Sequence, residues 1–208
     1  MNNHDTPPVA FAGVQFHSLR GRSVLVTGGA SGIGADIVRA FAGQGCQVGF
    51  LDRDTAAGEA LAASLPQVHF RACDVTDVPA MQAALAALQV AIGGVDVLVN
   101  NVAHDERHSI ESVTPAYFDG RVAINLRPHF FATQAVLSSM RARGGGAIVN
   151  MGSASWKIKG TCELEYRANL RNDRLFILNL NEVFQINIRF FGELLDRGGH
   201  PADAVVVV

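Results

Sequence analysis

The sequence predicts an α/β fold, in which helices cover both faces of a doubly wound parallel sheet. Short runs rich in β-branched residues alternate with Ala-rich segments of helical period from residue 23 onwards. Several of these runs are apolar at successive positions, which indicates strands that are buried on both faces. The chain has 208 residues, of which 49% are hydrophobic and 17% charged, and this is sufficient for one domain with a sizeable core.

The expected elements follow one another as strand, turn and helix. We predict strands at residues 23–27, 47–51, 68–72, 95–100 and 147–151, and helices at residues 33–42, 55–64, 78–92 and 115–143. Each helix then connects two parallel strands, so a ligand is expected beyond the carboxyl ends of the strands.

The two ends of the chain differ from this pattern. Residues 1–16 are polar with two adjacent prolines, and we expect a mobile arm. Residue usage changes after Tyr166: residues 1–166 contain 26 Ala, whereas residues 167–208 contain three. Residues 167–191 are expected to be helical and then strand-like, and residues 204–208 have strand propensity.

Composition excludes several classes of partner. A net charge of -2 and a pI near 6.4 give no reason to expect nucleic acid or an anionic membrane as a partner. No apolar run has the length of a signal peptide or of a membrane-spanning helix. Cys46, Cys73 and Cys162 lack metal-ligand or CxxC spacing, so we interpret them as reduced, mostly buried thiols in a cytoplasmic protein.

The first predicted strand leads into the glycine-rich turn TGGASGIG, residues 27–34. Glycine permits the tight turn at position 28, close approach to a pyrophosphate at position 32, and helix packing at position 34. An acidic residue ends the second strand, where its carboxylate can accept hydrogen bonds from a ribose diol. We therefore predict a Rossmann-type dinucleotide site that includes Gly28, Ser31, Gly32, Ile33, Gly34 and Asp52.

The residues at the end of the second strand also bear on the choice of cofactor. The Asp52 carboxylate repels a 2'-phosphate, which favours NAD over NADP. The adjacent Arg53 could pair with that phosphate and so works in the opposite direction. NAD is the predicted cofactor, with NADP as the alternative.

From about residue 19 to residue 166 the chain resembles the short-chain dehydrogenase/reductase family. The motifs that carry the resemblance occur in order: the glycine turn, CDVTD with Asp74 and Val75, NNVA at residues 100–103 in place of the usual NNAG, Asn125, Ser153 and Tyr166. The resemblance implies that Asp74, Val75, Asn101 and Ala103 contribute to the cofactor site. It implies a dinucleotide-binding catalytic domain at residues 17–166.

By the same resemblance Asn125, Ser153 and Tyr166 occupy three of the family's four catalytic positions. The tyrosine takes a proton from a substrate hydroxyl, the serine holds the same oxygen, and the asparagine anchors a water-linked proton path. The fourth position, four residues after the tyrosine, is a lysine in the family and Leu170 here. Arg171 is about 140° round a helix from the tyrosine and is no obvious replacement.

A narrower resemblance is to bacterial dehydrogenases that oxidise the anomeric carbon of aldoses such as xylose, arabinose, galactose or fucose to a lactone. It rests on the segments NNVAHDERH and GSASW. The implied sugar-binding residues are Asp105, Arg107, His108, Ser155 and Trp156. A polyol needs several donors and acceptors, and an aromatic face suits the CH face of a pyranose. A solvated charged loop is the alternative interpretation of residues 105–108.

The segment HDERH, residues 104–108, comes near the HExxH zinc pattern. Its second residue is Asp, and it follows a strand rather than lying within a helix, so no metal site is predicted.

Three functions remain open after the sequence. The first is an NAD-dependent aldose 1-dehydrogenase, the second is a truncated, catalytically impaired homologue that binds NAD or a partner, and the third is a reductase of a non-sugar carbonyl. We predict that the tail at residues 167–208 replaces the family's C-terminal strands. Homo-oligomers are usual in the family, but this altered tail puts one in doubt here.

Overall fold

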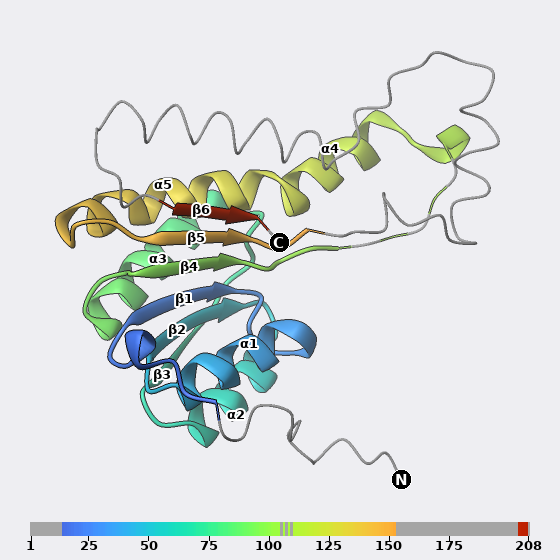
Figure 1. The fold of residues 1–208 in the computed structure, drawn as a ribbon. Helices are drawn as coiled ribbons and strands as arrows, with labels where there is room; N and C mark the ends of the chain where they lie inside the picture. Colours follow the sequence, from blue (N-terminus) through green and yellow to red (C-terminus); the bar gives the residue numbers. More distant parts are fainter. Residues whose placement is uncertain (1–13, 105, 107, 109, 153–203, 208) are drawn as a thin grey trace, which may run out of the picture.

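The computed structural model describes residues 14–104, 106, 108, 110–152 and 204–207. These residues form a parallel sheet in the order β3-β2-β1-β4-β5-β6 with helices on both faces (Figure 1). The strands are β1 (Ser23–Thr27), β2 (Gln47–Asp52), β3 (Val68–Ala72), β4 (Val97–Asn100), β5 (Ala147–Asn150) and β6 (Ala204–Val207). The predicted α/β, doubly wound architecture is confirmed.

Helices connect the successive strands from β1 to β5. The α-helices are α1 (Gly32–Gly43), α2 (Thr55–Ser64), α3 (Val78–Ile92), α4 (Pro115–Asn125) and α5 (Arg127–Ala142), and two short 3-10 helices are η2 (His17–Leu19) and η3 (Ile110–Ser112). Aspartates at the starts of α2 and α3 accept hydrogen bonds from the first turn, Asp54 from the N–H of Ala57 and Asp77 from the N–H of Ala80.

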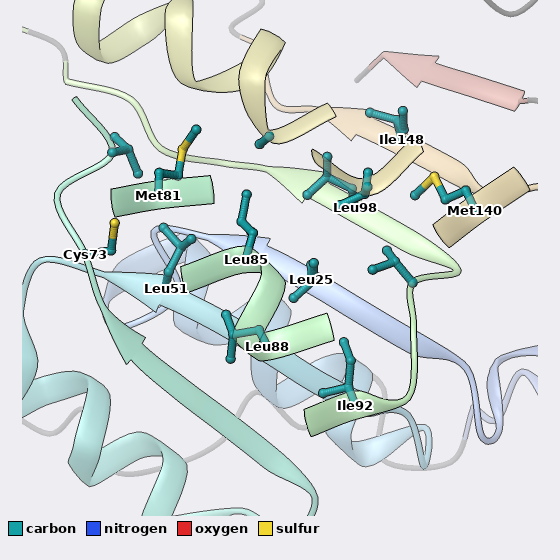
Figure 2. Close-up of a cluster of buried hydrophobic side chains, with 14 residues drawn as sticks. Leu25, Leu51, Cys73, Met81, Leu85, Leu88, Ile92, Leu98, Met140 and Ile148 are labelled. Carbon is teal, nitrogen blue, oxygen red and sulfur yellow. The ribbon is translucent and has the colours of Figure 1, made fainter. Parts of the chain in front are cut away.

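Alternate residues of the strands enter two separate hydrophobic clusters. In β1, Leu25 faces the cluster that α3 and α5 cover, whereas Val24 and Val26 face the cluster that α1 and α2 cover. Figure 2 shows the first cluster, where Leu25, Leu51 and Leu98 of the sheet lie with leucines of α3. Because full burial of one such side chain contributes about 2 kcal/mol, both faces stabilise the sheet.

Strand β4 begins two residues later than predicted, and the side chain of Asp96, which directly precedes it, makes several buried contacts. Its carboxylate accepts hydrogen bonds from the N–H of Ser23 at 2.8 Å and from Nε and Nη2 of Arg143 at 3.0 and 2.8 Å. Arg22 Nη1 lies 3.3 Å away, and the Asp96 side chain is only 7% exposed. Burial raises the pKa of Asp96, but these hydrogen bonds outweigh it and hold the pKa below its ordinary value.

The prediction of a single long helix at residues 115–143 is wrong at one point. The structure has two helices, α4 and α5, which meet at Leu126, where φ is -124° and ψ is -53°. Pro128 lies in the first turn of α5, and a proline clashes with the carbonyl four residues earlier and lacks an N–H. The break in the helix is therefore a consequence of Pro128.

The strand predicted from residues 204–208 is present as β6. It pairs in parallel with β5, with Ala147 opposite Ala204 and Asn150 opposite Val207. In the part of the chain that the structure describes, this strand covers the edge of β5 that would otherwise have unpaired backbone groups. It thus takes the outer position next to β5, where the sequence predicted a replacement of the family's strands.

The structure describes part of the predicted N-terminal arm and two of the three cysteines. The Gln44 side chain accepts a hydrogen bond from the N–H of Phe16 and donates one to the carbonyl of Val14. Cys46 and Cys73 are buried free thiols, as predicted, and Cys162 lies outside the described residues. Among the described helices, none is long and apolar enough to cross a membrane.

We expect Asp96→Asn to lower the free energy of unfolding by about 3 kcal/mol, because the change removes one partner of a buried ion pair. The matched control is Asp36→Asn, whose pair with Arg39 is exposed and which should change stability by less than about 0.5 kcal/mol. Urea denaturation of both variants measures the difference. Equal effects of the two variants would contradict this role for Asp96.

Candidate functional site: a cleft at the carboxyl edge of the sheet

A cleft of about 630 Å³ lies beyond the carboxyl ends of the central strands. Its wall includes nine of the ten residues that the sequence predicts for cofactor binding: Gly28, Ser31, Ile33, Gly34, Asp52, Asp74, Val75, Asn101 and Ala103. The tenth, Gly32, belongs to the same turn but does not line the cleft. Residues that were not among the predicted site residues complete the wall: Arg53, Cys73, Thr76, Val102, His104, Gly120, Arg121 and Ile124.

The glycine turn packs tightly under the cleft. Gly28 has a φ of +70°, and its N–H donates to the carbonyl of Leu51 at 2.8 Å. A Cβ at Gly34 would overlap the carbonyl oxygen of Gly28 and would lie 2.7 Å from Nδ2 of Asn101. The first residue of α1 follows Ser31, whose side chain accepts no hydrogen bond from the helix. The amino end of α1 thus keeps N–H groups that can bind an anion.

Asp52 joins the turn to the end of β2. One carboxylate oxygen accepts a hydrogen bond from the N–H of Ala30 at 3.0 Å, and the other accepts one from the N–H of Asp54 at 3.0 Å. Each carboxylate oxygen can accept more than one hydrogen bond. The half-buried Asp52 therefore retains acceptor capacity toward the cleft.

Asp74 forms the next part of the wall, after β3. Its Oδ1 accepts hydrogen bonds from the N–H of Thr76 at 2.9 Å and from the Thr76 hydroxyl at 2.8 Å. These two bonds lower the pKa of Asp74 below its ordinary value and keep the carboxylate ionised. In the neighbouring Cys73, burial and then the charges of Asp74 and Asp77 raise the pKa of the thiol, which stays protonated.

Asn101 connects the end of β4 to the end of β1. Its Nδ2 donates to the carbonyls of Thr27 at 3.2 Å and Gly28 at 2.9 Å, and its backbone N–H donates to Oγ1 of Thr27 at 3.0 Å. These bonds hold the glycine turn against the NNVA segment. The side chain that the sequence assigned to cofactor binding therefore also fixes the shape of the cleft.

Asn125 lies behind the wall rather than in it. As the last residue of α4, it accepts a hydrogen bond at Oδ1 from the N–H of His104 at 2.7 Å, and its Nδ2 donates to the carbonyl of His104 at 3.2 Å. The amide side chain thus pairs with both backbone groups of a residue that lines the cleft.

Several predicted site residues cannot be placed. Ser153, Tyr166, Asp105, Arg107, Ser155 and Trp156 lie outside the described residues, as does Leu170. His108 is described and exposed: its Nδ1 lies 2.9 Å from the hydroxyl of Tyr117 and 2.9 Å from the carbonyl of Glu106. Within the described residues, no group of three or more His, Cys, Asp or Glu could hold a metal ion.

Sequence reasoning missed two polar residues beside the cleft. Arg121 contacts Glu106 at 3.3 Å and Nδ1 of His104 at 2.7 Å, and its guanidinium lies 5.0 Å from the centre of the Tyr117 ring. His129 is 3% exposed, and its Nε2 lies 3.1 Å from the carbonyl oxygen of Val102. Burial lowers the pKa of His129, which favours the neutral ring. Their four-residue spacing from Asn125 is the signal that could have revealed both.

Comparison with known proteins identifies the family. The family described as short chain dehydrogenase matches residues 22–169. The chain belongs to the short-chain dehydrogenase family. A D-xylose 1-dehydrogenase of Caulobacter vibrioides is 49% identical over 148 residues, which are 69% of this chain and 58% of that protein. A "probable galactose dehydrogenase" of Rhizobium meliloti is 46% identical over 147 residues, which are 68% of this chain and 57% of that protein.

Solved structures of this dehydrogenase family share the fold. A 3-ketoacyl-(acyl-carrier-protein) reductase from Brucella melitensis, complexed with NADH, aligns with a TM-score of 0.62 at 30% identity over 66% of this chain and 59% of that one. A 7α-hydroxysteroid dehydrogenase complexed with NADH and a bile-acid derivative aligns with a TM-score of 0.65 at 26% identity, over 72% of this chain and 60% of that one. The chain spans less than three fifths of the length of the curated sugar dehydrogenases named above.

We expect Gly34→Ala to weaken nucleotide binding at least tenfold, because the added methyl group forces the Gly28 carbonyl and the Asn101 side chain apart. The control is Gly43→Ala at the other end of α1, where an added Cβ meets no atom within 4 Å. Fluorescence titration with NADH measures both dissociation constants. Unchanged affinity in Gly34→Ala would show that this close contact does not shape the nucleotide site.

Proposed function

We propose that the protein is an NAD-dependent short-chain dehydrogenase that oxidises an aldose at its anomeric carbon to a lactone. The observation that carries the proposal is the cleft in which the glycine turn, the Asp52 carboxylate and the segment 101–104 meet. Two curated relatives that are more than 45% identical over their aligned parts are named as xylose and galactose dehydrogenases. We further propose a cytoplasmic enzyme with a small-molecule substrate, in line with the family match and with the names of these relatives.

The residues of the cleft fit a dinucleotide. The amino end of α1 can bind the pyrophosphate, and the tight contacts of Gly34 leave the turn close to the helix. Asp52 has acceptors for the hydroxyls of the adenosine ribose, and Asp74 and Val75, which the family resemblance assigns to the adenine, line the same cleft. We propose NAD rather than NADP because a 2'-phosphate would meet the Asp52 carboxylate.

In the proposed reaction the anomeric hydroxyl of the sugar becomes the carbonyl of a lactone. Tyr166 takes the hydroxyl proton, and Ser153 donates a hydrogen bond to the same oxygen. The C1–H bond breaks with its electron pair, and bound NAD supplies the acceptor for this hydride. Asn125 holds both backbone groups of His104, which keeps the wall of the cleft in place beside the reacting sugar.

A second candidate function is nucleotide binding without turnover. Leu170 stands where the family has a lysine, so this chain lacks the cation that lowers the pKa of the catalytic tyrosine and binds the nicotinamide ribose. A homologue that binds NAD but lacks this cation would fit that observation.

Turnover on a sugar panel decides between these functions. We expect reduction of NAD with xylose, arabinose, galactose or fucose, and we expect Leu170→Lys to raise kcat at least tenfold near pH 7, because the ammonium would favour the tyrosinate. Absorbance at 340 nm follows the reaction, with Leu170→Met as the uncharged control. Binding of NADH without turnover in either protein supports the second candidate, whereas turnover with apolar ketones alone overturns the sugar assignment.

Asp52→Asn tests the choice of cofactor. We expect affinity for NADH to fall about tenfold, because a hydrogen bond to a charged group contributes about 1.5–3 kcal/mol, and we expect affinity for NADPH to rise as the repulsion is lost. Glu59→Gln is the matched control, since it removes the same charge from the exposed surface of α2. An unchanged ratio of the two dissociation constants would mean that Asp52 does not select between the cofactors.

A further inference from the structure

Four polar side chains at four-residue spacing run along α4 and α5: Arg121, Asn125, His129 and Thr133. Each contacts a residue at two-residue spacing along the chain that leaves β4, namely Glu106, His104, Val102 and Asn100. We call these four pairs the polar ladder. The helices and the chain that leaves β4 run in opposite directions. Residues later in the helices therefore contact residues earlier in that chain.

The spacing of the polar ladder has a simple geometric origin. Four residues of an α-helix advance about 6 Å, and two residues of an extended chain advance about 6.6 Å. The two periods nearly coincide, so side chains on one face of the helix stay in register with alternate residues beside it. The pairs continue across the break at Leu126, because Asn125 lies before it and His129 after it.

Three of the four pairs of the ladder lie beyond the end of β4, where the sheet no longer holds the backbone. Strand β4 ends at Asn100, and residues 102–104 form part of the wall of the cleft. From the β1 side, Oγ1 of Thr27 accepts the N–H groups of Asn101 and Val102. From the helix side, the ladder binds the carbonyl of Val102 and both backbone groups of His104. The Val102 carbonyl is part-buried, where a backbone group without a partner would be costly, whereas the hydrogen bonds to His104 are exposed.

The His129 pair shows why a polar side chain occupies a buried position. The Val102 carbonyl can only accept, so Nε2 of His129 carries the proton and donates to it. A leucine at this position would fill a similar volume without the desolvation cost of an imidazole. Unlike leucine, the imidazole provides a hydrogen-bond donor for the carbonyl oxygen of Val102.

The Arg121 pair closes the outer end of the ladder. Its Nη1 donates to Nδ1 and the carbonyl of His104, and it pairs with the Glu106 carboxylate. One guanidinium thereby contacts both His104 and Glu106. The Arg121 side chain is only 20% exposed, but the Glu106 side chain is 51% exposed, so solvent still screens this ion pair.

We propose that the polar ladder positions residues 102–104 as one wall of the nucleotide site, and that His129 and Arg121 are positioning residues for ligand binding there. Neither residue is required to touch the reacting atoms. The proposal rests on the proposed function only in its use of NADH as the probe. It predicts that loss of one pair loosens the wall locally while the sheet stays intact.

The test compares variants of the full chain by amide hydrogen exchange and by NADH fluorescence titration. We expect His129→Leu and Arg121→Met to speed exchange at residues 101–104, above all at the His104 N–H, with no change in β1. We expect the dissociation constant for NADH to rise about tenfold, which corresponds to about 1.4 kcal/mol. His129→Gln keeps a donor near the Nε2 position and should restore most of the affinity.

Two controls separate positioning from general stability. Val136→Ala leaves a cavity in the core next to the same helix and should lower the Tm without selective exchange at residues 101–104. Arg141→Met removes an exposed arginine of α5 outside the ladder and should change neither measurement. Uniform exchange across the sheet in the ladder variants, or equal effects of Val136→Ala on NADH affinity, would overturn the proposal.

The two proposals fail in different ways. Selective exchange at residues 101–104 in a protein that does not bind NADH supports the ladder and refutes the proposed function. NADH binding with unchanged exchange and affinity in the ladder variants refutes the ladder alone.

Discussion

The parallel pairing of β1 with β2 on one side and β4 on the other is the constraint on which the rest of the structure depends. Register places Thr27 beside Leu51 and Asn100, so three strands end at one level. The glycine turn, Asp52 and the NNVA segment each lie at one of these ends. Polar groups that are far apart in the sequence therefore meet in a single cleft, without any of them having to reach across the core.

The wall of that cleft is held from two directions, and each direction uses a different kind of group. On the β1 side, one threonine hydroxyl and one asparagine amide bind backbone groups of the turn and of the NNVA segment. On the helix side, the guanidinium of Arg121, the imidazole of His129 and the amide of Asn125 bind backbone groups of the wall. Because side chains on both sides bind backbone groups of Asn101, Val102 and His104, the segment has a defined position.

Much of the fold and half of the site could be predicted because the relevant residues carry local information. Gly34 could be predicted because the tight turn requires a glycine there, and Asp52 could be predicted because it lies at the end of a strand. Asp96 could not be predicted, since its role depends on Arg143 and Arg22, which only the folded sheet brings near. His129 was missed for a related reason: its partner is a backbone carbonyl, so its four-residue spacing from Asn125 is the only mark that it leaves in the sequence.

The ion pairs of Asp96 lie at the amino edge of the sheet, on the side opposite the cleft. This separation divides the molecule into one edge that anchors the strands and another that meets ligands. Substitutions at the ligand edge can then accumulate while the anchoring contacts remain intact. This separation allows the binding residues to change while the fold is kept, because the effects on stability of substitutions more than about 10 Å apart are almost additive.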